Sequence, residues 1–268
     1  MKRMSRILGA FLCLVMLLTG TAMAAGNPMI DVSTASDGYF TVDCDKYIGV
    51  KMKVGVTFQG KTQYYDYTAG EESSYTFSEG DGSYTITLYR NLYSTKYRAV
   101  TSTRAYVELA DEMAPYLTST YEVTFSADDP VGLMAAELCA EAESDADKIV
   151  AIHNYIARNF TYDYGFAAKV RSGEITTYVP NTTEVLAAGK GICYDFTTLF
   201  AAMCRSQDIP CAVAKGYLGG AYHAWNRIYM DEEWIAVDMT ASVCRRNMNA
   251  VDLNKCVVSL DRYYGYTF

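Results

Sequence analysis

The sequence predicts an α+β protein, in which a small all-β domain precedes a domain of mixed helices and strands. Residues 38–125 are rich in Tyr, Thr and Val, in short alternating runs separated by Gly-containing turns, which is typical of antiparallel strands. From about residue 129 the apolar residues recur at helical spacing. After Ile209-Pro210, strand-like runs return. We therefore expect two domains, at residues 25–127 and 128–268.

Residues 1–24 have the features of an export signal. Three cationic side chains precede an apolar run at Ile7–Leu18, and Ala22-Met23-Ala24 offers a small-residue cleavage site. No later run is long enough for a membrane span, so we expect a protein that is secreted or held in the cell envelope. Removal of the signal changes the formal charge from −8 to −11, because it removes three cations and no acidic residue. This charge argues against nucleic acid as a partner.

The all-β domain is predicted to be a small sandwich. Alternating runs such as Tyr47–Val54 and Ser83–Leu88 are separated by Gly-rich turns, notably at Glu79–Gly82. Its many tyrosines suit half-exposed strands. Binding of sugars or peptides by these rings is the alternative interpretation.

Two helices are predicted in the second domain. Ser144-x-x-Asp147 resembles a capping box, and apolar residues follow at helical spacing along residues 149–160. One of the residues on that apolar face is His153, for which we expect a buried structural role. The second helix is expected from Gly191 to about Ser206, with its apolar stripe buried.

Cys193 lies at the predicted start of the second helix. The unpaired N–H groups and the dipole at a helix start favour the thiolate, which is the nucleophilic form of cysteine. The same N–H groups can face a developing oxyanion. Lys190 would add to this effect if its side chain turned inward. The alternative is a buried structural thiol.

His223 and Asp238 fall on consecutive predicted strands joined by a short turn. A two-residue loop at Met230-Asp231, or a four-residue loop at Tyr229–Glu232, would place them directly opposite on one face. A register shift by two residues would leave them diagonal neighbours. A carboxylate in either position can orient the imidazole and stabilise its protonated form. An ordinary cross-strand pair is the alternative.

Three separated motifs, in matching order over about residues 130–242, resemble those of the bacterial transglutaminase-like superfamily. They are the segments Gly189–Phe200, His223–Asn226 and Trp234–Thr240. The resemblance implies a papain-like transglutaminase core, in which the nucleophile helix packs on an antiparallel sheet. It also implies a catalytic triad with Cys193 as nucleophile, His223 as general base and acid, and Asp238 as the orienting carboxylate.

The resemblance implies amide chemistry through a thioester, by peptidase or amidase action or by protein-glutamine acyl transfer. The expected partner is a protein or peptide substrate, with cell-wall peptide as one candidate. The alternative is a non-catalytic binding protein of the cell envelope or surface on the same scaffold, because fold does not imply activity.

Two positions depart from the patterns of related enzymes. Met239 stands where many relatives have proline, and Ala187 stands where papain-type peptidases place a glutamine that donates to the oxyanion. Tyr162 is one candidate for the missing donor. We expect no metal or cofactor, because the chain has neither an EF-hand loop nor a CxxC pair. Seven cysteines follow the signal; Cys193 is expected to be free, and the pairing of the others stays open.

Overall fold

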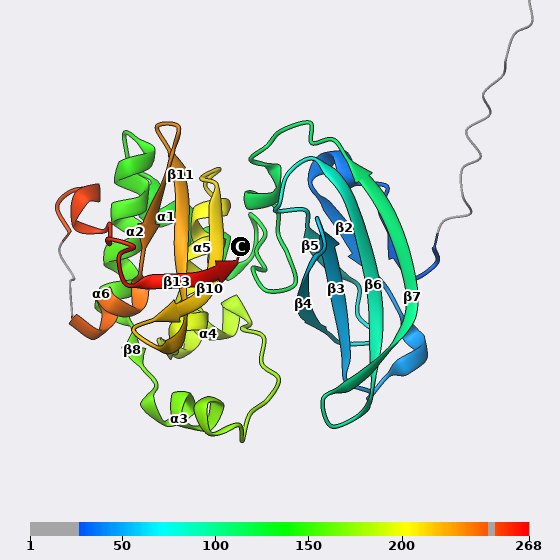
Figure 1. The fold of residues 1–268 in the computed structure, drawn as a ribbon. Helices are drawn as coiled ribbons and strands as arrows, with labels where there is room; N and C mark the ends of the chain where they lie inside the picture. Colours follow the sequence, from blue (N-terminus) through cyan, green and yellow to red (C-terminus); the bar gives the residue numbers. More distant parts are fainter. Residues whose placement is uncertain (1–26, 246–249, 268) are drawn as a thin grey trace, which may run out of the picture.

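The computed structural model describes residues 27–245 and 250–267, and it has an all-β domain beside a domain of helices and strands (Figure 1). This arrangement confirms the predicted α+β class. The predicted export signal lies outside the described residues. Within the described ranges, no helix is long and apolar enough to cross a membrane.

Two antiparallel sheets form the all-β domain, called the β-domain below. One has the strand order β1-β2-β5 and the other the order β4-β3-β6-β7. Their bounds are β1 (Ile30–Asp31), β2 (Tyr39–Val42), β3 (Met52–Phe58), β4 (Lys61–Tyr67), β5 (Ser73–Thr76), β6 (Gly82–Tyr93) and β7 (Lys96–Val107). Buried side chains from both sheets, such as Phe40 and Ile86, share one hydrophobic core. The domain is therefore a sandwich, as the alternating runs predicted.

Within the described residues, the second domain contains six helices and a four-stranded antiparallel sheet of order β12-β11-β10-β13. The helices are α1 (Pro130–Cys139), α2 (Asp145–Asn159), α3 (Tyr164–Ser172), α4 (Thr182–Ala188), α5 (Cys193–Arg205) and α6 (Met239–Arg245). The strands are β10 (Cys211–Leu218), β11 (Ala221–Met230), β12 (Glu233–Val237) and β13 (Tyr263–Thr267), with β8 (Thr161–Tyr162) and β9 (Lys190–Gly191) forming a separate parallel pair. Short 3-10 helices lie at Ala35–Asp37, Asp45–Tyr47, Ala114–Tyr116 and Leu253–Lys255.

The two predicted helices are α2 and α5. The start of α2 is capped by Ser144, whose Oγ accepts a hydrogen bond from the N–H of Asp147 at 3.2 Å. Helix α5 was expected to bury one apolar stripe, but every residue from Asp195 to Arg205 is buried. The reason is that α5 packs on β10 and β11 and is also contacted by α1, α2, α4 and α6. It is thus the central element of its domain.

The hairpin of β11 and β12 differs in register from the prediction. Met230 pairs with Glu233, so the loop is Asp231-Glu232, one residue later than the two-residue loop expected. Both loop residues have positive φ, 51° and 63°, the backbone conformation of a type I′ turn. Asp238 follows the end of β12, and the helix α6 begins at once after it. His223 and Asp238 are consequently diagonal neighbours and not a directly opposed pair.

Candidate active site

Cys193 is the first residue of α5 and is half buried. No side chain caps this helix start, so its first N–H groups have no partner within the helix and are available to an oxyanion. The Asp195 carboxylate accepts a hydrogen bond from the N–H of Ile192 at 2.7 Å, which holds the chain just before Cys193. A Cβ atom at Gly191 would lie 2.6 Å from the Cβ of Asp195, so glycine is needed for this close approach.

His223 and Asp238 are joined by a hydrogen bond of 2.9 Å between Nε2 and Oδ2. Only 2% of the Asp238 side chain is exposed. Burial raises the pKa of this carboxyl, but donors from His223, Tyr263 and the N–H of Ala241 hold it below the usual range. The ionised carboxylate can only accept, so Nε2 of the imidazole carries the hydrogen. That bond leaves Nδ1 for the thiol of Cys193.

The pKa of His223 is set by opposing effects. Burial lowers it, whereas hydrogen bonds to Asp238 and Cys193, together with the negative charges of both groups, raise it to about 9. At neutral pH the imidazole is therefore mainly protonated. The imidazole can therefore serve as a proton donor.

Tyr263 also belongs to this site, although no motif of the sequence points to it. Its hydroxyl donates to Oδ2 of Asp238 at 2.7 Å, the same oxygen that binds His223. Its ring packs edge-on against Trp225, with 4.8 Å between the ring centroids. Tyr263 opens β13, which pairs with β10 at the edge of the sheet. The only sequence signal was the strand-like, tyrosine-rich end of the chain.

Lys190 does not turn inward toward the nucleophile. Its ammonium lies 3.3 Å from Oδ2 of Asp163, and 61% of its side chain is exposed. Tyr162 pairs with Gly191, two residues before Cys193. Burial raises the pKa of its hydroxyl to about 12, and Cys193 adds to the effect. Tyr162 thus keeps its proton at neutral pH and can serve as a hydrogen-bond donor.

The remaining residues singled out in the sequence have structural positions. His153 is fully buried, and its Nε2 lies 2.8 Å from Oγ of Ser242, within hydrogen-bond distance. Met239 is buried at the start of α6, and Ala187 lies near the end of α4. All seven cysteines of the described residues are free thiols.

The chain resembles known proteins in sequence and in structure. Residues 133–239 match the family model of the transglutaminase-like superfamily. The kyphoscoliosis peptidase of Mus musculus is 29% identical over 119 residues, which are 40% of this chain and 17% of that protein. A candidate cysteine protease from Cytophaga hutchinsonii aligns with a TM-score of 0.43 and 16% identity, covering 85% of this chain and 83% of its own. Red sea bream transglutaminase aligns with a TM-score of 0.32 and 10% identity, covering 75% and 48%.

Proposed function

Residues 133–239 form a transglutaminase-like domain, and from this premise we propose that the chain is a cysteine-dependent amide-bond enzyme with Cys193, His223 and Asp238 as its catalytic triad. One observation carries the proposal: His223 bonds the buried carboxylate of Asp238 at 2.9 Å, and Cys193, at the uncapped start of α5, contributes to its raised pKa. The proposed nucleophile, the acid–base group and the orienting carboxylate thus lie next to one another in the order that a cysteine–histidine enzyme needs.

In the first half of the proposed reaction, the Cys193 thiolate attacks the carbon of a carboxamide. Negative charge develops on the carbonyl oxygen, where the first N–H groups of α5 and the hydroxyl of Tyr162 can donate to it. The imidazolium of His223 then gives its proton to the leaving amine as the C–N bond breaks. The product is a thioester on Cys193.

In the second half, neutral His223 takes a proton from water, and the resulting hydroxide attacks the thioester. The C–S bond breaks, the acid leaves, and the thiolate and imidazolium are restored. A primary amine in place of water would give acyl transfer. We take water as the main acceptor, because no amine-binding groove is specified by the sequence.

The proposed substrate is a protein or peptide, and cell-wall peptide remains one candidate. Export to the cell envelope or the medium is proposed from residues 1–24 alone. The segment shared with the mouse peptidase is 17% of that protein, so its name does not define the substrate of this chain.

Mass spectrometry of peptide and amine mixtures incubated with the mature protein tests the proposal. We expect hydrolysis or deamidation products as the majority, and none from Cys193→Ala. Isopeptide as the sole product would overturn the preference for water but keep the triad. Full activity in Cys193→Ala would overturn the proposal itself. If the protein were a binding scaffold, a thiol-directed amide electrophile would label several cysteines and only after unfolding.

A further inference from the structure

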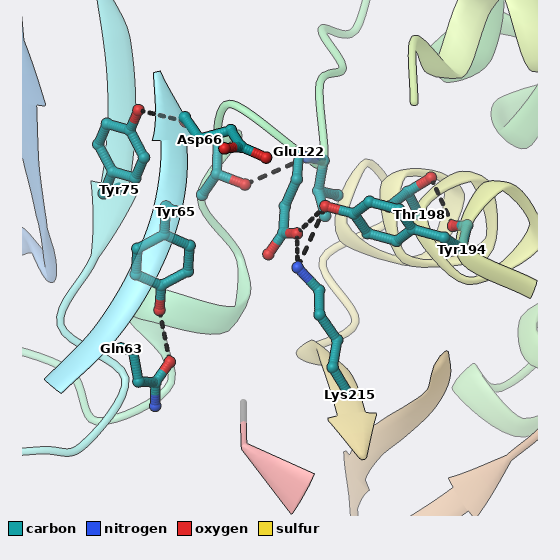
Figure 2. A network of polar contacts seen from close by, with 10 residues as sticks. Gln63, Tyr65, Asp66, Tyr75, Glu122, Tyr194, Thr198 and Lys215 are labelled. Carbon is teal, nitrogen blue, oxygen red and sulfur yellow. Dashed lines mark hydrogen bonds and ion pairs between the residues drawn. The ribbon is translucent and has the colours of Figure 1, made fainter. Parts of the chain in front are cut away.

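Tyr194, which directly follows Cys193, binds a carboxylate that lies in neither the helices nor the sheet of the second domain. The hydroxyl of Tyr194 donates to Oε2 of Glu122. Glu122 lies in the segment between β7 and α1, where the chain leaves the β-domain. Figure 2 shows this carboxylate between Tyr194 of α5 and Lys215 of β10, with Tyr65 and Tyr75 of the β-domain on the other side.

Lys215 contacts both members of this pair, Glu122 and Tyr194. Its ammonium forms an ion pair with the same oxygen of Glu122, donates to the Tyr194 hydroxyl at 3.1 Å, and lies 4.5 Å from the centroid of that ring. The side chains of Glu122 and Lys215 are only 13% and 21% exposed. Water screens such a pair weakly, and loss of either partner leaves a shielded, unpaired charge.

The β-domain holds Glu122 through the preceding residue. The N–H of Tyr121 donates to the carbonyl oxygen of Ser74 in β5 at 3.0 Å. The ring of Tyr121 packs against that of Tyr75, with 4.8 Å between the centroids. Glu122 is therefore anchored to the β-sandwich on one side and to the nucleophile helix on the other.

A second anchor holds the first turn of α5. The hydroxyl of Tyr178, in the loop between α3 and α4, donates to Oδ1 of Asp195. The two residues directly after Cys193 are thus each fixed by a separate segment of the chain. The first turn is the part of a helix that frays most readily, and here it carries both the thiol and the candidate oxyanion donors.

We propose that Glu122 is a positioning residue: through Tyr194 it fixes the first turn of α5, so that the β-domain is a working part of the catalytic unit. This inference rests on the proposed function, because it assigns a task to the nucleophile of that same site. Glu122 touches no reacting atom and acts only through Tyr194.

The test is the rate at which iodoacetamide alkylates Cys193 in the folded mature protein, followed by peptide mapping. This readout needs no substrate. We expect Tyr194→Phe and Glu122→Gln each to slow alkylation of Cys193 about fivefold. The double variant should be no slower than either single variant, because both changes break one linkage. Circular dichroism checks that each variant is folded.

Asp66→Asn is the matched control. It breaks the Lys53–Asp66 ion pair within the β-domain, which is 2.8 Å long and joins side chains that are 30% and 28% exposed. It should leave the alkylation rate unchanged. If Tyr194→Phe and Glu122→Gln melt at lower temperature but keep the full rate, Glu122 is a structural brace and the inference is wrong. If Cys193 of the unaltered protein reacts no faster than its six other cysteines, the proposed function fails as well.

Discussion

The surroundings of the two histidines of this chain produce opposite chemistry in one domain. His153 has no exposed surface, and its hydrogen-bond neighbours are the neutral side chains of Ser242 and Asn154. Burial lowers its pKa. His223 has a side chain that is 11% exposed, but it bonds the carboxylate of Asp238, and its pKa is raised to about 9.

The comparison teaches that a charged partner can reverse the effect of burial on the protonation state of a histidine. Burial disfavours the charged imidazole at both positions. At His153 the hydrogen bond with Asn154 opposes that effect only weakly, so burial prevails and the pKa is lowered. At His223 the interactions with Asp238 and Cys193 outweigh it, and the ring is mainly protonated at neutral pH.

The largest expected effect comes from replacing each of the two histidines, in separate variants, with glutamine. His223→Gln removes the acid–base group and should lower turnover by about four orders of magnitude or more. His153→Gln should leave the turnover of folded protein unchanged and lower the free energy of unfolding by about 1–3 kcal/mol, because a buried hydrogen bond is lost. Turnover and urea unfolding measure the two effects. Equal losses of turnover in both variants would contradict the comparison.

Asp238→Asn should have the next largest effect. The amide keeps the shape of the side chain but removes the charge that holds the imidazole in its tautomer, so turnover should fall by about two to four orders of magnitude. The fold, checked by circular dichroism, should be retained. Turnover within a factor of two of the unaltered protein would mean that Asp238 is only a cross-strand partner.

Tyr263→Phe should have a smaller effect. The ring and its packing on Trp225 stay, and only the hydroxyl that donates to Asp238 at 2.7 Å is removed. We expect turnover to fall about three- to tenfold with little change in KM. Tyr264→Phe is the control, because that side chain is 54% exposed and stacks on Tyr217. A loss of turnover in the control alone would remove Tyr263 from the site.

The smallest expected effect concerns stability: the free energy of unfolding should depend on pH through both histidines, which checks the comparison directly. The folded pKa of His223 is raised from about 6.5 to about 9, so its contribution is full below pH 6.5 and is lost as pH rises toward 9. The loss should be roughly 3 kcal/mol. The pKa of His153 is lowered, so its contribution is lost as pH falls below 6.5.

Urea unfolding between pH 5 and pH 9.5 measures how the free energy of unfolding changes with pH, both on the acidic side and on the alkaline side. Asp238→Asn should flatten the alkaline slope, and His153→Gln should flatten the acidic one. An alkaline slope that survives in Asp238→Asn would show that another group causes it.

The sequence by itself determined the local features of this protein. The cap at Ser144, the start of a helix at Cys193, the alternation of the β-domain and the two strands of the hairpin all follow from short-range patterns. The exact hairpin register did not follow, because Asp231 and Glu232 adopt positive φ without the Gly or Asn that usually marks such a turn.

Only the tertiary structure decided which distant side chains reach the candidate triad and the first turn of α5. Tyr263 lies 25 residues after Asp238 in sequence, and Glu122 lies 72 residues before Tyr194. These contacts depend on how β13 pairs with the sheet and on how the two domains pack together. No short-range pattern in the sequence predicts either arrangement. The direction of Lys190 was open for the same reason: its charge is visible in the sequence, but Asp163, which attracts it away from Cys193, is placed there by the folded chain.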